Sequence, residues 1–111
     1  MTYTSVLAQS TVSDLRVAEP WYTALLDREP DARPMHGLLE WQVARGGGLQ
    51  VWAEPERAGR STVLLATDDL DATAAQLIAS GIATDGVEAG GGARLIRLTD
   101  PDGNRVIVVG S

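Results

Sequence analysis

Apolar and polar residues alternate along several short stretches of the chain, a period of two that is typical of strands with one buried face. This pattern predicts strands in residues 3–12, 36–44, 48–53, 61–67, 94–98 and 105–109. Residues 82–89 fit either a short strand or a loop. Glycine-rich runs separate several of these stretches and are read as flexible connectors.

Two other stretches place apolar residues at helical spacing. Ser13-Asp14 supplies an N-cap signal for residues 15–26, and Asp68-Asp69 offers caps for residues 70–80. Pro20 interrupts the first helical stretch, so the helix either begins there or is kinked there. Two prolines then break the pattern in residues 27–34.

The order strand, helix, strands occurs twice. Residues 12–15 (VSDL) fall on residues 67–70 (TDDL) when the chain is laid on itself. We therefore predict one domain over residues 1–111, with a first module at about 1–56 and a second at about 60–111.

The end of the chain carries the most specific local signal. In RLIRLTDPDGNRVIVVG, residues 94–110, a turn sequence lies between two apolar runs. Pro101 presets the backbone for a turn, Asp100 accepts local hydrogen bonds, and Gly103 or Asn104 tolerates a positive φ. The segment predicts two strands joined by a tight turn.

This hairpin and the segment TVSDLRVAEPWYTALL resemble the vicinal oxygen chelate superfamily, which includes glyoxalases, bleomycin-resistance proteins and extradiol dioxygenases. The resemblance implies an α+β fold of two βαβββ modules. Each module is expected to curl a mixed sheet into a half-open cup with its helix on the outer face. Members of this size usually form homodimers in which the cups become two ligand clefts.

Enzymes of the superfamily hold a divalent metal with His and Glu side chains at four cup-facing positions. The resemblance places Leu7, Gln50, Thr62 and Ile107 at these positions. Leucine and isoleucine have no lone pair to donate, and threonine and glutamine are weak neutral ligands. We therefore expect no metal and no other cofactor. His36 stands alone at the edge of a strand and is expected to be exposed or to anchor a loop.

Strand alternation also predicts which side chains line the cup. The expected ligand-binding residues are Leu7, Gln9, Gln50, Trp52, Thr62, Leu64, Leu95, Arg97, Arg105 and Ile107. In residues 38–43 the phase stays open: either Glu40 and Gln42 face the cleft with Trp41 in the core, or the reverse. Tryptophans in strands suit stacking on a planar or cationic ligand.

Composition narrows the classes of partner. The sequence contains nine basic residues, all arginine, and fifteen acidic residues, so its net charge is −6. This negative charge disfavours nucleic-acid binding. The absence of cysteine excludes disulfides and thiolate metal sites. No apolar run is long enough for a membrane helix, and no signal peptide is recognisable, so a cytoplasmic protein is expected.

Three functions fit these observations. The first is a metal-free binding protein of the bleomycin-resistance type that sequesters a planar or cationic natural product in a cleft at the dimer. The second is a metal-independent enzyme, an isomerase or lyase, that uses cleft residues such as Arg97 or Glu40. The third is a regulatory or structural domain with a vestigial cleft. Three observations favour the first function: the four metal positions lack good metal ligands, the net charge is negative, and tryptophans lie in predicted strands.

Overall fold

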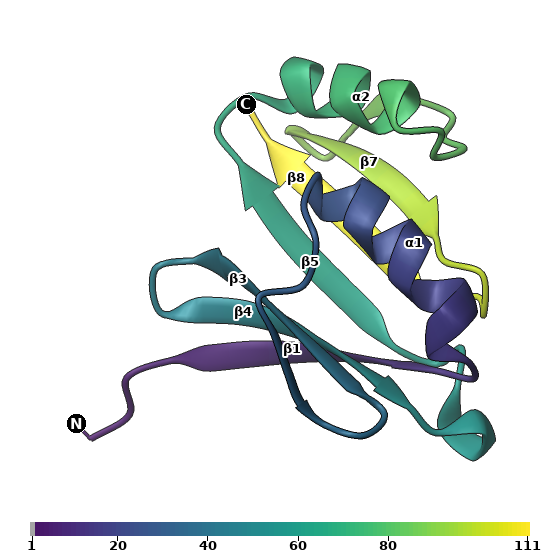
Figure 1. Ribbon diagram of the computed structural model, residues 1–111. Helices are drawn as coiled ribbons and strands as arrows, with labels where there is room; N and C mark the ends of the chain where they lie inside the picture. Colours follow the sequence, from purple (N-terminus) through teal and green to yellow (C-terminus); the bar gives the residue numbers. More distant parts are fainter. Residues whose placement is uncertain (1) are drawn as a thin grey trace.

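A computed structural model describes residues 2–111 and folds them into two four-stranded sheets, each with one α-helix (Figure 1). The first module comprises β1 (Val6–Val12), α1 (Leu15–Leu26), β2 (Ala32–Met35), β3 (Leu38–Ala44) and β4 (Gly47–Ala53). The short 3-10 helix η1 (Pro55–Arg57) leads to β5 (Thr62–Thr67), α2 (Leu70–Ala79), β6 (Val87–Gly90), β7 (Ala93–Thr99) and β8 (Arg105–Gly110). The expected α+β fold of two βαβββ modules is confirmed.

The two modules build their sheets in the same way. Sheet A has the order β1-β4-β3-β2, and sheet B has the order β5-β8-β7-β6. In each sheet the first strand pairs in parallel with the last strand of the module, and the remaining pairs are antiparallel. Within residues 2–111 the strands do not close into a barrel, so both sheets keep free edges.

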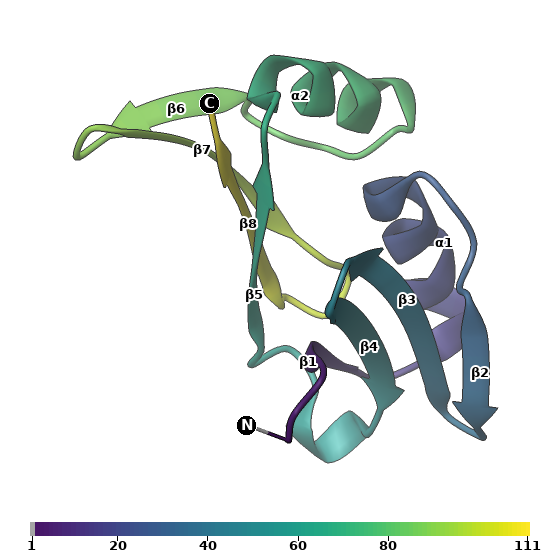
Figure 2. The same cartoon turned by 90° about the vertical axis from the view of Figure 1, so that its left-hand side faces the viewer.

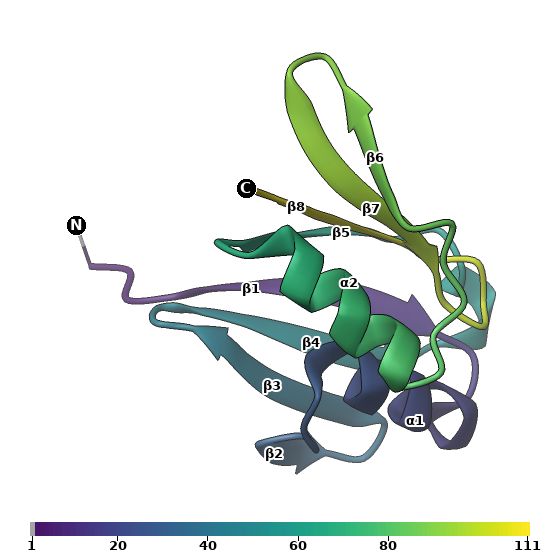
Figure 3. The ribbon, with the colours of Figure 1, turned by 90° about the horizontal axis from the view of Figure 1, so that it is seen from above.

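The sheets meet at an angle, and the two helices occupy the space between them (Figure 2). Seen from above, α2 lies beside the end of α1 (Figure 3), where the Gln76 amide donates to the carbonyl oxygen of Ala24 at 2.9 Å. Each sheet therefore has one face packed on helices and one open face. The two open faces lie on the outer sides of this angle and point in different directions (Figure 2).

The core fills the space between the helices and the packed faces. Its buried members come from both modules and form one cluster. They are Val12, Ala18, Tyr22, Leu25, Leu39, Trp41, Leu49, Val51, Val63, Leu70, Leu77, Ile82, Ile96, Leu98, Val106 and Val108. No helix in the described part of the chain is long and apolar enough to cross a membrane.

Both helices begin where the caps predict. The Asp14 carboxylate accepts from the backbone N–H of Arg16 at 2.9 Å, and the Asp69 carboxylate accepts from that of Ala72 at 3.0 Å. Helix α1 continues through Pro20, so the alternative in which it begins at Pro20 is wrong. Leu15 is its first residue, because the Asp14 cap satisfies the first turn.

Strand β2 was not expected in the proline-containing segment before residue 36. It pairs only with β3 and lies at the edge of sheet A. Pro34 is compatible with this position because an edge strand has one row of backbone groups without a ladder partner. In the second module, residues 87–90 form β6, so the alternative of a short strand in residues 82–89 agrees with the structure.

The DPDGN turn between β7 and β8 holds the two modules together. The Asn104 side chain is fully buried; its amide donates to the carbonyl oxygen of Thr11, and its oxygen accepts from the Ser61 N–H, both at 2.8 Å. Asp100 fixes the turn by accepting from the N–H groups of Asp102 and Asn104, each at 2.9 Å. The motif therefore forms a structural joint.

Tyr22 links this joint to α1. Its hydroxyl donates to the Asp100 carboxylate at 2.6 Å and lies 2.6 Å from the hydroxyl of Ser10. Burial, followed by the hydrogen bond to Asp100, raises the pKa of the Tyr22 phenol far above its usual value. The phenol consequently stays protonated and keeps its donor at physiological pH.

Candidate functional site

The open face of sheet A is the first candidate surface. Side chains alternate along β1, β3 and β4, so the neighbours of the buried Val12, Leu39, Leu49 and Val51 point to the open side. We define this open face by Leu7, Gln9, Thr11, Leu38, Glu40, Gln42, Gln50 and Trp52.

A polar row crosses this face at its centre. Gln50 is in register with Gln9 on one side and with Glu40 on the other. The Gln9 amide donates to the Gln50 side-chain oxygen at 3.2 Å, and the Gln50 amide donates to the Glu40 carboxylate at 2.9 Å. Three strands thus place three polar side chains in one continuous row. Sequence reasoning named each residue as a site candidate but did not predict that they are bonded to one another.

Trp52 lies next to this row, two residues beyond Gln50 on the same face of β4. It is half-buried and in register with Thr11 and Leu38. Its indole N–H donates to the Glu54 carboxylate at 3.2 Å. The indole donor is therefore already used, and the ring itself is the part of Trp52 that a ligand can contact.

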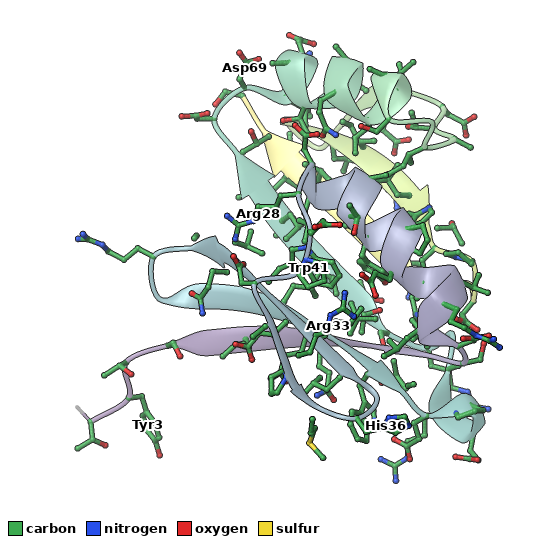
Figure 4. All side chains as sticks on the ribbon, in the orientation of Figure 1. Tyr3, Arg28, Arg33, His36, Trp41 and Asp69 are labelled. Atoms are coloured by element: carbon green, nitrogen blue, oxygen red, sulfur yellow. The ribbon has the colours of Figure 1, made fainter. Side chains whose placement is uncertain are left out.

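The structure resolves the phase that the sequence left open in β3. Trp41 is fully buried between sheet A and α1 (Figure 4), and its indole N–H donates to the carbonyl oxygen of Arg28 at 2.9 Å. Its ring lies 6.3 Å from that of Tyr22, centroid to centroid. Glu40, on the other face, is half-buried. The alternative in which Trp41 lines the cleft is therefore wrong, because its side chain is enclosed by the core.

The open face of sheet B has the same design with different side chains. Alternation with the buried Val63, Ile96, Leu98, Val106 and Val108 points the intervening residues outwards. We define this open face by Thr62, Leu64, Ala66, Leu95, Arg97, Thr99, Arg105, Ile107 and Val109. Leu64 is 61% exposed, and Arg97 is held by Glu88 at 2.6 Å. This face is apolar at its centre, with arginines near it.

The predicted site residues therefore form two groups. Leu7, Gln9, Glu40, Gln50 and Trp52 share the open face of sheet A. The open face of sheet B carries Thr62, Leu64, Leu95, Arg97, Arg105 and Ile107. The structure assembles each group but does not bring the two groups together, because the open faces point in different directions (Figure 2).

The four positions at which superfamily enzymes hold a metal do not fit one here. Leu7 and Ile107 have no donor atom, and both ends of the Gln50 amide are engaged in the polar row. Thr62 is a neutral hydroxyl on the other sheet. Within residues 2–111, no group of three or more His, Cys, Asp or Glu side chains is placed to hold an ion. We therefore derive no metal chemistry for this chain.

A cavity of about 610 Å³ lies at the end of sheet A, between the start of α1 and the turn from β2 to β3. His36 is exposed on its rim in that turn, and Arg33 reaches from β2 to Glu19 of α1 at 2.6 Å (Figure 4). This ion pair lowers the pKa of the Glu19 carboxyl. The cavity contains no member of the Gln9–Gln50–Glu40 row, and its two arginines are already paired, Arg33 with Glu19 and Arg16 with Asp14 at 3.5 Å.

Comparison with known proteins identifies the fold and the family. A family model described as a glyoxalase-like domain matches residues 6–109. A glyoxalase/bleomycin resistance protein from Catenulispora acidiphila is 30% identical, with a TM-score of 0.90 over 96% of this chain and 97% of that chain. No curated protein sequence matches.

Two further solved structures have the same fold. TnmS3, an antibiotic-binding protein from Streptomyces sp. CB03234, is 28% identical with a TM-score of 0.79 over 99% of this chain and 98% of that chain. A bleomycin-binding protein complexed with bleomycin is 20% identical, with a TM-score of 0.80 over 96% and 98% of the two chains. Since the family model spans nearly the whole chain, the protein belongs to the glyoxalase-like domain family.

Proposed function

We propose that this protein is a metal-independent binding protein that sequesters a planar or cationic small molecule. The observation that carries the proposal is the open face of sheet A, where the Trp52 ring lies beside the Gln9–Gln50–Glu40 row. An aromatic wall with a few fixed polar groups is the usual composition of a small-molecule site. The relative TnmS3 is an antibiotic-binding protein, which supports this class of function.

A second copy of the chain completes the cleft in this proposal. Leu7 is 37% exposed on one open face and Leu64 is 61% exposed on the other, so each face has apolar surface to cover. Because the two faces of one chain point in different directions, they meet only if sheet A of one copy faces sheet B of the other. A two-fold axis repeats this contact, and the dimer then contains two equivalent clefts.

The metal-independent enzyme remains the weaker alternative on geometric grounds. Glu40 and Arg97 lie on different sheets, and each is engaged, Glu40 with Gln50 and Arg97 with Glu88. Glu40 and Arg97 of one chain do not face a common substrate, because the open faces of their sheets point in different directions (Figure 2). Binding requires only the aromatic wall and the polar row.

Calorimetric titration of the purified protein with bleomycin and with 9-aminoacridine, a planar cation, tests the proposal. We expect saturable binding of at least one probe at one molecule per chain, unchanged by EDTA, in a species of about twice the chain mass by light scattering. A folded protein that binds neither probe contradicts the binding function. Binding that disappears with EDTA contradicts metal independence, and a monomer that binds at full affinity contradicts the shared cleft.

A further inference from the structure

We propose that Gln9, Gln50 and Glu40 form a hydrogen-bonded row of fixed polarity, and that this row selects planar ligands that carry a cationic N–H group on or beside the ring. The inference rests on the proposed binding function and specifies the chemical class of the ligand. Glu40 is the residue that sets this selectivity.

The polarity of the row follows from its acidic end. An ionised carboxylate only accepts hydrogen bonds, so Gln50 must turn its amide nitrogen toward Glu40, as observed at 2.9 Å. This orientation turns the oxygen of Gln50 toward β1, and Gln9 must then donate its own amide nitrogen, as observed at 3.2 Å. One carboxylate therefore orients both amides, although it touches only the nearer one.

The consequence is a row with unused acceptors at both ends. One carboxylate oxygen of Glu40 receives the Gln50 amide, and the other accepts no hydrogen bond from the described residues. At the far end the side-chain oxygen of Gln9 likewise accepts none within residues 2–111. A ligand that lies along this row meets oxygen at each end, so its favourable partners are N–H groups.

The charge of Glu40 favours the same class of ligand as the free hydrogen-bond acceptors of the row. Glu40 is half-buried, and no Arg, Lys or His of residues 2–111 forms an ion pair with it. The open face of sheet A, as defined above, includes no basic residue. A half-buried carboxylate without a cationic partner interacts favourably with a cation that displaces water from it.

Trp52 supplies the other half of the recognition. Its N–H is occupied by Glu54 at 3.2 Å, so the indole offers a ligand its π-face rather than a donor. The negative face of an indole attracts cations and stacks on planar rings. Ring and row lie side by side on β4, which matches a ligand whose cationic group is attached to an aromatic system.

Three acridines test this selectivity because they share one ring system and differ in charge. They are 9-aminoacridine, which is cationic at neutral pH, unsubstituted acridine, which is neutral, and acridine-9-carboxylate, which is anionic. Each is titrated calorimetrically into the unmodified protein and into Glu40→Gln. Glu56→Gln is the matched control, because Glu56 is exposed on η1 outside the row and its replacement changes the net charge by the same amount.

We expect the unmodified protein to bind 9-aminoacridine at least about tenfold more tightly than acridine-9-carboxylate. Glu40→Gln should reduce this ratio by about tenfold, since a glutamine at position 40 removes the charge and lets both amides reverse. Glu56→Gln should leave the ratio within about twofold, because solvent and salt screen an exposed charge.

A ratio that is the same in Glu40→Gln and in the unmodified protein overturns the inference, as does a preference for the carboxylate. The latter result would mean that an arginine of a second copy, such as Arg105, neutralises Glu40. In either case the binding function stands as long as acridine itself binds. If none of the acridines and no bleomycin binds to the folded protein, the proposed function fails and the inference fails with it.

Discussion

The central rows of the two open faces occupy equivalent positions and have opposite chemistry. In sheet A the last strand of the module places Gln50 between Gln9 and Glu40. The same register in sheet B places Ile107 between Leu64 and Arg97. A polar, acidic row in one module thus corresponds to an apolar, basic row in the other.

The packed faces show no such divergence. Trp41 lies opposite Leu49 in sheet A, and at the equivalent place in sheet B Leu98 lies opposite Val106; all four are buried. Packing against helices requires apolar side chains in both modules, whereas the open faces contribute little to folding. The two halves therefore differ mainly on the sides that do not pack on the helices.

The largest expected effects come from the packed faces, where the two sheets should behave alike. Trp41→Ala should lower the free energy of unfolding by about 3–5 kcal/mol and Leu98→Ala by about 2–5 kcal/mol, because each leaves a cavity in the core. Urea unfolding followed by circular dichroism measures both. A loss below about 1 kcal/mol at either position would show that this packed face is not essential to stability.

The next largest effect is expected at the DPDGN turn, which joins the two modules. Asp100→Ala removes the acceptor of the Tyr22 hydroxyl and of the Asn104 amide, and we expect a loss of about 2–4 kcal/mol in unfolding free energy. Asp102→Ala is the control. It breaks hydrogen bonds to the exposed Ser13 and should cost less than about 1 kcal/mol. Equal losses in thermal or urea unfolding would contradict a special role for Asp100.

Trp52 and Val109 occupy equivalent places on the two open faces and test whether only one face binds an aromatic ligand. Trp52→Ala should weaken binding of 9-aminoacridine by about 1–3 kcal/mol in calorimetry, the range for an aromatic anchor. It should cost less stability than Trp41→Ala, because Trp52 is only half-buried. Val109→Ala should weaken binding less than Trp52→Ala does, and the reverse order would place the main ligand contact on sheet B.

The smallest effect concerns the ion pairs that tie each helix to its own sheet, Glu19 with Arg33 at 2.6 Å and Asp71 with Arg94 at 2.7 Å. Glu19→Gln and Asp71→Asn should each cost less than about 1 kcal/mol at neutral pH, because these pairs are largely exposed.

The contribution of the Glu19–Arg33 pair to the free energy of unfolding should depend on pH in the acidic range. The hydrogen bond from Arg33 holds the pKa of Glu19 below its usual value in the folded protein. The stabilisation by Glu19 is therefore fully present above the ordinary carboxyl pKa and is lost as the pH falls through the lowered one. Unfolding measured across this acidic range should show a shallower pH dependence in Glu19→Gln. Identical profiles would show that the pair contributes no pH-dependent stability.

The sequence was sufficient to predict what depends on neighbouring residues. Caps at Ser13-Asp14 and Asp68-Asp69, both helices and the β7–β8 hairpin are confirmed, with Asp14 and Asp69 as the capping residues, because capping and turn formation act over a few residues. The alternation of apolar residues also predicted the packed faces. Strand β2 was missed because it has four residues, includes a proline and depends on β3 for its only partner.

What the sequence could not predict depends on register between distant strands. Residues 38–43 begin with two leucines and place Trp41 beside Glu40, so both phases were acceptable until packing against α1 decided between them. The row from Gln9 to Glu40 requires β1 to pair with β4 in one particular register. Likewise, the turn residues Asp100 and Asn104 were recognised as a turn, but their buried contacts to Tyr22 and Thr11 come from the far end of the chain.

The pairing of every strand within its own sheet has an evolutionary consequence. Among residues 2–111, no backbone ladder crosses from β1–β4 to β5–β8, and the connection runs through the short η1 segment. A genetic exchange in this connector would replace a whole open face together with its helix and would leave every ladder intact. The module with the acidic row and the module with the arginine-containing row can thus be inherited and recombined as separate units, provided that the Asn104 joint is retained.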